Sequence, residues 1–190
     1  MKFDIILAGV GGQGVLSVSA IIASSALEEG LFVKQSEVHG MSQRGGAVLA
    51  HLRLADAPIA SDLIPHGCAS LILSMEPLES LRYLNFLSPD GAVVTAITPV
   101  QNIADYPPLD ELLDRIGKLP RARLVDGDRL ARDAGSARAT NMVMVGAASH
   151  DVPVPAATLE RFIEKTFAPK GEKVVATNLA AFRAGREAAL

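Results

Sequence analysis

A glycine-rich segment near the start of the chain has the residue types and spacing to bind an anion. It contains the pattern G-x-G-x-x-G, and its candidate binding residues are Gly9, Gly11, Gly12, Gln13 and Gly14. The segment follows an apolar run at 5–8 and precedes apolar residues at helical spacing, so we expect it to join a strand to a helix. Glycines there permit a tight turn, and the free N–H groups of the helix start favour an anion. The same glycines would equally serve a turn that packs helix against strand with nothing bound.

A second group of polar residues lies between positions 36 and 46. Its candidate contacts to a substrate or a partner are Glu37, His39, Ser42, Gln43 and Arg44. The segment follows an expected strand at 31–35, and the carboxyl ends of strands in open α/β sheets usually build the binding crevice. We therefore expect a loop that faces a ligand or a partner. The alternative is that Glu37 pairs with Arg44 and that His39 bonds to backbone.

A dinucleotide site requires more than the glycine segment. It usually has an acid at the end of the second strand, about 20 residues beyond the glycines, to hold a ribose hydroxyl. Here that strand is expected to end near Ser36, and the first acid after it, Glu37, falls late. This weakens the hypothesis of a self-sufficient nicotinamide or flavin oxidoreductase. A nucleotide-sensing domain without enzymatic activity is a third hypothesis.

The other reactive side chains are expected to be structural. Cys68 is the only cysteine and precedes an apolar strand, so we expect a small buried residue and no disulfide. One thiol cannot supply the four thiolates that an iron–sulfur cluster usually takes. His51 and His66 have no second ligand at metal-site spacing, so no metal site is expected.

Strand-like and helix-like stretches alternate along the chain, and these elements must position both polar groups. The expected strands are at 5–8, 31–35, 47–54, 69–74, 91–96 and 121–126, and the expected helices at 13–29, 77–87, 109–117, 141–149, 155–167 and 173–190. The alternation predicts the α/β class, with a Rossmann-like, mostly parallel sheet flanked by helices and a helical C-terminus. We expect residues 1–190 to form a single domain.

The composition of the chain argues against nucleic-acid binding and against a membrane-spanning segment. The net charge of -3 gives no basic excess for nucleic acid, and no apolar run approaches the roughly 18 residues of a membrane span. The first residues include an acid and lead directly into a strand pattern, unlike a signal peptide. We therefore expect a soluble, cytoplasmic protein that binds neither nucleic acid nor a membrane.

Taken together, the segments 9–15 and 36–46 resemble those of a known family. Their residues, order and spacing resemble the beta subunits of indolepyruvate:ferredoxin oxidoreductases and, more widely, the gamma subunits or domains of pyruvate and other 2-oxoacid:ferredoxin oxidoreductases. The resemblance implies a gamma-type domain that acts as a small subunit. Such enzymes oxidatively decarboxylate a 2-oxoacid with thiamine diphosphate, pass electrons through [4Fe–4S] clusters to ferredoxin, and form an acyl-CoA. In the indolepyruvate type the substrates are aryl pyruvates.

The resemblance also implies a division of labour, with the thiamine site and the clusters on a large partner subunit. The chain has no G-D-G…N-N thiamine signature, and the nearest string, at 126–128, is inverted and lacks the paired asparagines. We expect no catalytic residue and no cofactor in this chain alone, and CoA mainly on the large subunit. The expected partners are that subunit and, through the complex, ferredoxin, with a homodimer as an option for the isolated chain. A gamma subunit for another 2-oxoacid, or a stand-alone nucleotide-binding protein, is the alternative.

Overall fold

A six-stranded sheet forms the centre of the molecule in the computed structural model, which describes residues 1–39 and 45–190. The strand order is β2-β3-β1-β4-β5-β6. Strands β1, β4, β5 and β6 pair in parallel, whereas β3 runs antiparallel to both of its neighbours, β1 and β2. The strand bounds are Lys2–Val10 (β1), Phe32–His39 (β2), Ala47–Ala55 (β3), Ala69–Ser74 (β4), Leu87–Ala96 (β5) and Ala122–Val125 (β6).

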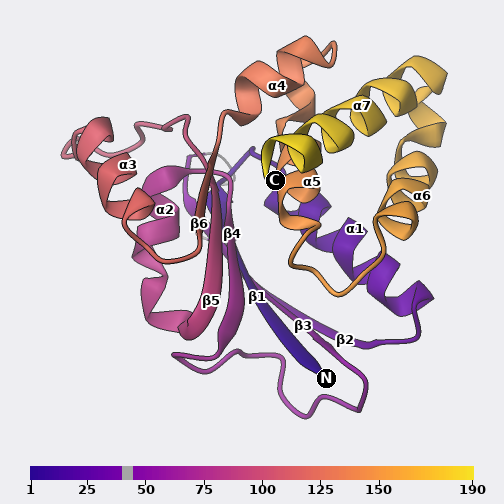
Figure 1. The fold of residues 1–190 in the computed structure, drawn as a ribbon, viewed down its shortest axis with the longest axis horizontal. Helices are drawn as coiled ribbons and strands as arrows, with labels where there is room; N and C mark the ends of the chain where they lie inside the picture. The colour runs from indigo at the N-terminus through magenta and orange to yellow at the C-terminus, as the bar shows by residue number, and fades with distance from the viewer. Residues whose placement is uncertain (40–44) are drawn as a thin grey trace.

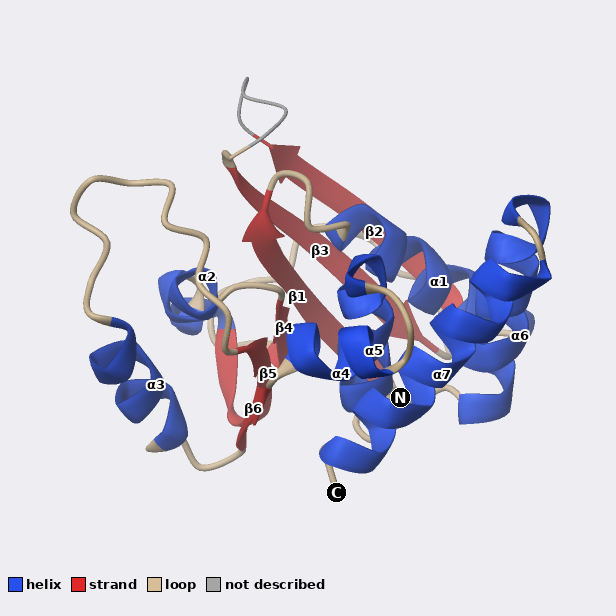
Figure 2. Cartoon of the chain, turned by 90° about the horizontal axis from the view of Figure 1, so that it is seen from above, coloured by secondary structure: helices blue, strands red, loops and turns tan. Residues whose placement is uncertain are grey.

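Helices cover both faces of this sheet. Helices α2 and α3 lie on one side, and α1, α5, α6 and α7 lie on the other (Figure 1). Figure 2 shows the same arrangement from above. The helix bounds are Val15–Glu28 (α1), Pro77–Arg82 (α2), Leu109–Gly117 (α3), Gly127–Asp133 (α4), Thr140–Ala148 (α5), Ala156–Phe167 (α6) and Glu172–Ala188 (α7). This architecture confirms the predicted α/β class, the mostly parallel sheet and the helical C-terminus.

The apolar run in β1 explains its place inside the sheet. Ile5, Ile6 and Leu7 are fully buried, as expected of a strand covered on both faces. Because side chains alternate along a strand, Ile5 and Leu7 join the large core under α1 and α5, and Ile6 joins a smaller core under α2 and α3. The strand that ends in the glycine loop is therefore held from both sides.

Helix α5 crosses α7 with almost no space between the two backbones. A Cβ atom added to Gly146 would lie 1.9 Å from the carbonyl oxygen of Phe182, and one added to Gly185 would lie 1.9 Å from that of Val143. Such distances leave room for hydrogen only. The sequence analysis did not single out either glycine.

Several element boundaries differ from the sequence predictions. Residues 36–39, predicted as loop, are strand, because β2 pairs with β3 as far as the register His39↔Val48. The helix predicted to reach 87 ends at Arg82, and β5 begins at Leu87 rather than at 91. Helix α4 was not predicted, although Asp126 gives a local signal: its carboxylate caps the helix by accepting a hydrogen bond from the Arg129 N–H, 3.1 Å away.

The prediction of a buried Cys68 is wrong. The residue is exposed and lies in a turn closed by its own N–H and the carbonyl oxygen of Pro65, 3.3 Å apart. Burial begins one residue later, at Ala69, the first residue of β4. The apolar run that follows the cysteine predicted the strand correctly but does not extend its burial backwards.

His51 and His66, for which the sequence analysis expects a structural role, both pack against Phe86. His51 is buried, its Nδ1 accepts a hydrogen bond from the Ile64 N–H, and its ring meets Phe86 edge-on at 5.3 Å. His66 packs edge-on against the same ring at 4.6 Å. Within the described ranges no three His, Cys, Asp or Glu side chains are grouped as a metal site would need. None of the described helices has the length and apolar character needed to cross a membrane.

Candidate functional site

The glycine segment joins β1 to α1, as predicted, and two of its glycines have backbone conformations that other residues rarely adopt. Gly14 is the N-cap of α1 and has φ 81° and ψ 27°, in the left-handed region. Gly12 has φ 105°. Gly9 is required for a different reason, because an added Cβ would lie 2.9 Å from Cγ2 of Val15. The turn, the helix start and the helix–strand packing thus each depend on a glycine.

Gln13 uses its side-chain amide inside this loop. Its Oε1 accepts a hydrogen bond from the Val10 N–H at 2.7 Å, and its Nε2 donates to the Met75 carbonyl oxygen at 3.0 Å. The backbone N–H of Gln13 also donates to the Val10 carbonyl oxygen. Gln13 therefore ties the loop to the ends of β1 and β4, and this is the role the geometry gives it.

The start of α1 offers unpaired hydrogen-bond donors. The helix has no side-chain cap and no acidic residue in its first turn. In the described part of the chain, the backbone N–H groups of Val15, Leu16 and Ser17 donate to no acceptor. Unpaired N–H groups at a helix start carry partial positive charge, which favours an anion in front of them.

A cavity of about 570 Å³ lies beside these donors, and we call it the glycine-loop cavity. It opens at the carboxyl ends of β1, β4 and β5, the usual place for ligands in open α/β sheets. Its walls come from the glycine loop, from residues that follow β4 and β5, and from the region around the start of α5. The lining residues are Gly12, Gln13, Gly14, Met75, Ala96, Thr98, Val100, Asp128, Ala137, Arg138, Thr140 and Asn141.

The cavity has one cationic and one acidic side chain in its lining. Arg138 is exposed and makes no ion pair within the described ranges. Asp128 accepts a hydrogen bond from the Thr140 hydroxyl at 2.9 Å, so one of its oxygens is engaged. Asn141 Oδ1 is buried and has no hydrogen-bond partner among the described residues. The lining thus retains free polar groups for a ligand.

A buried acid behind the cavity positions part of its wall. Glu76, which is 1% exposed, follows β4 and accepts hydrogen bonds from the Val100 N–H at 3.2 Å and from the Tyr106 hydroxyl. Burial and the hydrogen bond to Glu76 raise the pKa of Tyr106, so the phenol stays protonated and donates. Glu76 thereby holds residues 97–108 against the sheet. The sequence analysis missed Glu76, although an acid just before Pro77 is a recognisable helix-cap position.

A third segment reaches the glycine loop through its backbone. The Gly11 N–H donates to the Gly46 carbonyl oxygen at 2.8 Å, and the Gly45 N–H donates back to the Gly11 carbonyl oxygen. Asn102 Nδ2 donates to the Gly45 carbonyl oxygen at 2.6 Å. The end of the predicted polar segment, the glycine loop and residues 97–108 therefore meet at one edge of the sheet.

The two polar groups predicted from the sequence are only partly brought together. Glu37 lies within β2 and is exposed, and His39 is the last residue of that strand. Strand β3 separates β2 from β1, so Glu37 does not line the cavity. Ser42, Gln43 and Arg44 lie outside the described residues, as does the alternative pairing of Glu37 with Arg44.

The sheet order also bears on the dinucleotide hypothesis. A dinucleotide-binding fold places a parallel second strand beside β1, and the acid at its end reaches the ribose. Here the antiparallel strand β3 takes that place. Glu37 is therefore a whole strand away from where a ribose on the glycine loop would lie.

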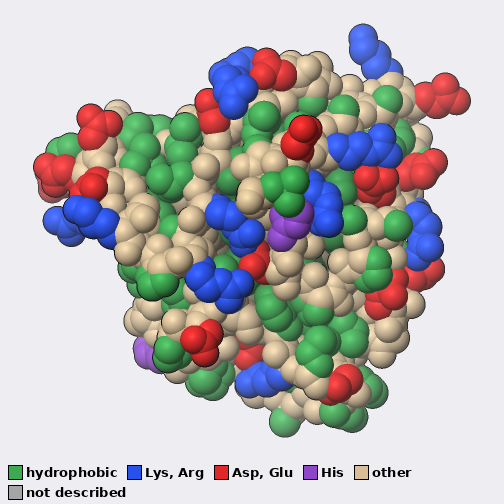
Figure 3. Space-filling view, viewed as in Figure 1, with side chains coloured by type: hydrophobic (Ala, Val, Ile, Leu, Met, Phe, Trp, Pro, Cys, Tyr) green, Lys and Arg blue, Asp and Glu red, His purple; other side chains and the backbone are tan. Residues whose placement is uncertain are grey.

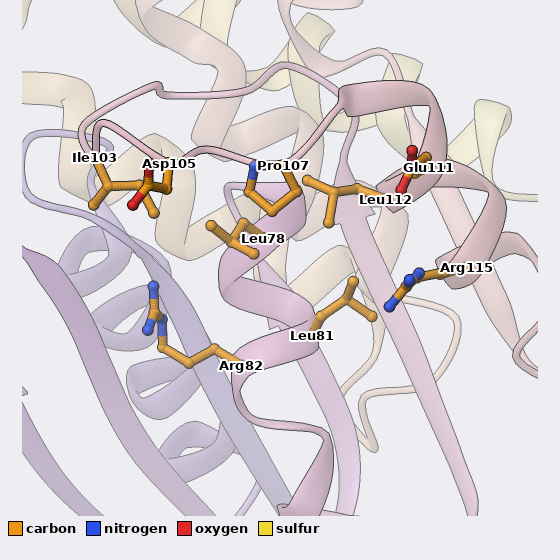
Figure 4. A pocket seen from close by; sticks show the side chains of 9 residues that line it. All are labelled: Leu78, Leu81, Arg82, Ile103, Asp105, Pro107, Glu111, Leu112 and Arg115. Carbon is orange, nitrogen blue, oxygen red and sulfur yellow. The ribbon is translucent and has the colours of Figure 1, made fainter.

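A second hollow, of about 540 Å³, lies on the other face of the sheet between α2 and α3. Leu78 and Leu81 lie opposite Pro107 and Leu112, with charged residues around them (Figure 4). No glycine-loop residue lines this hollow. The glycine-loop cavity is the stronger candidate because it combines unpaired donors, left-handed glycines and the carboxyl edge of the sheet.

Charge is dispersed over the face of the molecule shown in Figure 3, where basic and acidic side chains are interspersed. Among the described residues several exposed cations form ion pairs, for example Arg183 with Glu160. Mixed charge of this kind is typical of a solvated surface and provides no broad field for a polyanion.

Comparison with known proteins identifies the relatives of this chain. It is 37% identical to the indolepyruvate oxidoreductase subunit IorB of Archaeoglobus fulgidus over 199 residues, which cover 100% of the chain and 96% of the relative. The corresponding subunit of Pyrococcus horikoshii is also 37% identical, over 99% of the chain and 96% of the relative. A 2-oxoglutarate synthase subunit, KorC of Methanothermobacter marburgensis, is 27% identical over 98% of the chain and 96% of the relative.

Solved structures share the fold. Pyruvate oxidoreductase subunit PORC of Thermotoga maritima superimposes with a TM-score of 0.76 at 25% identity, covering 98% of this chain and 96% of that one. A 2-oxoglutarate:ferredoxin oxidoreductase of Magnetococcus marinus, described with 2-oxoglutarate, coenzyme A and succinyl-CoA bound, gives 0.80 at 24% identity, over 99% of this chain and 31% of that one. The family model for pyruvate ferredoxin/flavodoxin oxidoreductase matches residues 4–188. The chain belongs to the pyruvate ferredoxin/flavodoxin oxidoreductase family.

Proposed function

We propose that this chain is the small subunit of a 2-oxoacid:ferredoxin oxidoreductase of the indolepyruvate type. The main support for the proposal is the difference in sequence identity between two groups of relatives, each of which matches nearly the whole of this chain. Named indolepyruvate subunits are 36–37% identical, whereas subunits named for 2-oxoglutarate or ketoisovalerate are 27–28% identical. In this role the chain assembles with a large subunit that oxidatively decarboxylates an aryl pyruvate, passes electrons to ferredoxin and forms an acyl-CoA.

Thiamine diphosphate and [4Fe–4S] clusters do not fit the residues of this chain. At the one string that resembles a thiamine signature, Asp126 caps α4 and Asp128 bonds to Thr140, so both carboxylates serve the fold. A cluster usually takes four thiolates, and the chain has one cysteine. We therefore assign both groups to the large subunit and no catalytic residue to this chain.

Coenzyme A, in contrast, fits the glycine-loop cavity through its phosphates. The unpaired N–H groups at the start of α1 follow directly after Gly12, Gln13 and Gly14, which line a space of about 570 Å³, and Arg138 supplies a cation in the same lining. A diphosphate suits a helix start because it accepts several backbone N–H bonds and carries the complementary charge. The chain then contributes binding and orientation of the acyl acceptor.

Reconstitution with the large subunit tests the proposal. The complex should reduce a viologen dye with indolepyruvate, thiamine diphosphate and CoA, and either subunit alone should not. Its kcat/KM should be highest for indolepyruvate in a panel that includes pyruvate and 2-oxoglutarate. Turnover by this chain alone would refute the dependent role, and a preference for 2-oxoglutarate would reassign the substrate.

A further inference from the structure

Strand β2 forms one margin of the sheet, and nothing in the described part of the chain pairs with its outer side. The sheet order places β3 on its inner side (Figure 2). The strand has 8 residues, contains no proline, and pairs with β3 without interruption from Phe32 to His39. The opposite margin differs, since β6 has only 4 residues. The outward N–H and C=O groups of a long, regular edge strand can pair with another strand.

Two large apolar side chains project from β2 into solvent. Phe32 is 46% exposed and Val38 is 59% exposed. Both lie on the face of the sheet opposite α1, because side chains alternate along the strand and the odd-numbered Val33 packs against the core under α1. On that face Leu49 of β3 is the pairing partner of Val38 and is itself only partly buried. The edge strand therefore has an exposed apolar side chain near each of its ends.

The lysine in β2 does not protect this edge. A lysine on an edge strand commonly prevents the sheet from being extended. Here Nζ of Lys34 donates to the Ala60 carbonyl oxygen at 3.0 Å. That loop lies over β3, because the carbonyl oxygen of the next residue, Ser61, accepts a hydrogen bond from Arg53. The ammonium group is thus held toward the inner side of β2 and away from the open edge.

A second copy of the same strand complements β2 in one antiparallel register. With Gln35 opposite Gln35 of the second copy, Phe32 lies opposite Val38 at both ends of the pairing, so each exposed apolar side chain is covered by another. Lys34 then lies opposite Ser36, and no like charges face each other. A shift of two residues in one direction places Lys34 opposite Lys34. A shift of two residues in the other direction leaves Phe32 opposite a position beyond the end of β2.

We propose that two copies of this chain associate through β2, paired antiparallel about a two-fold axis at Gln35, to form one continuous sheet. The outward backbone groups of the edge supply the hydrogen bonds, and the Phe32–Val38 pairs supply the specificity. Two-fold symmetry uses the open edge of both copies, so the association ends at the dimer. The proposal does not depend on the proposed function, because it uses only the edge strand and its side chains.

Charge substitutions at the two apolar positions test the edge. Sedimentation velocity of the full chain should show a reversible dimer. Phe32→Lys and Val38→Glu should each weaken it about tenfold or more, because the symmetry places each new charge against an apolar side chain twice. Leu124→Glu on β6, the other edge strand, is the control and should dimerise like the wild type. All three side chains are exposed, so melting temperatures should stay close to that of the wild type.

Mixing Phe32→Lys with Val38→Glu tests the register. In a mixed dimer the introduced ammonium and carboxylate groups face each other at one end of the pairing, and the original Phe32 and Val38 face each other at the other end. The mixture should therefore dimerise more tightly than either variant alone. A mixture that is no tighter than the single variants would disprove the register.

The same measurements can overturn the whole proposal. It is wrong if the wild-type chain remains monomeric at submillimolar concentration. It is also wrong if the dimer persists in the β2 variants or is weakened equally by Leu124→Glu, since the contact then lies on another surface. If the wild type is monomeric and the β2 variants instead lose binding to the large subunit, the edge belongs to that interface and the second copy is excluded.

Discussion

The glycine loop and the crossing of α5 with α7 both depend on glycine, but for different physical reasons. At the crossing, Gly146 and Gly185 face the backbone of the opposite helix, and an added Cβ would lie 1.9 Å from a carbonyl oxygen. In the loop, Gly12 and Gly14 have positive φ, and Gly12 has no neighbouring atom within 4 Å of an added Cβ. At the helix crossing, glycine is needed because there is no room for a Cβ atom. In the loop, glycine is needed because the backbone adopts positive φ.

Gly185→Ala should have the largest effect on stability. The new methyl group would overlap the backbone of α5, which cannot move without disturbing a helix that is buried on nearly all sides. We expect the free energy of unfolding to fall by about 3 kcal/mol. Urea denaturation followed by circular dichroism measures it. Gly117→Ala in α3 is the control, because its added Cβ has its nearest neighbour at 4.0 Å, and it should not destabilise. Equal midpoints for the two variants would disprove the close crossing.

Gly14→Ala should have an intermediate effect. The left-handed conformation costs a residue with a side chain about 1–2 kcal/mol, and the new Cβ would lie 2.9 Å from Asn141 Nδ2. The side chain of Asn141 can rotate, so we expect a loss of about 2 kcal/mol. Because the start of α1 carries the unpaired donors, the KM for CoA of the reconstituted complex should also rise. If the variant is destabilised but its KM for CoA is unchanged, the start of α1 is not part of the CoA-binding site.

Gly12→Ala should have the smallest effect on stability and a disproportionate effect on binding. Its φ of 105° is strained for alanine, but nothing has to move to accommodate the methyl group, so the loss should be about 1 kcal/mol. The methyl group would enter the lining of the glycine-loop cavity. We expect the KM for CoA of the reconstituted complex to rise because the methyl group occupies part of the cavity, and this rise should exceed any that the small loss of stability would cause. Wild-type kinetics would mean that no ligand closely approaches Gly12.

The sequence predicts the loop but not the crossing, because only the loop has a local signature. An apolar run, spaced glycines and a change to helical periodicity all lie within 30 residues. Gly146 and Gly185 become significant only when two helices pack together, and neither is part of a recognisable pattern. The segment 36–39 was predicted as loop because it is polar, and its pairing with β3 provides the hydrogen bonds that composition does not show.

The sequence likewise predicted only part of the candidate site. The glycine loop lies where the sequence placed it, and it lines a cavity at the carboxyl edge of the sheet. Glu37 does not line that cavity, because an antiparallel strand separates β2 from β1. Glu76 and Arg138 were missed, since their roles depend on segments that meet only in the folded chain.

The exposed Cys68 is a suitable site for attaching a fluorescent label. It is the only thiol in the sequence and lies one residue before β4, whereas the glycine loop follows the opposite end of the parallel strand β1. A fluorophore coupled there through a maleimide would label every molecule once, at the end of the sheet away from the glycine loop. Fluorescence anisotropy of the labelled chain would then report how fast it tumbles, and so whether it is free or carried in a larger assembly.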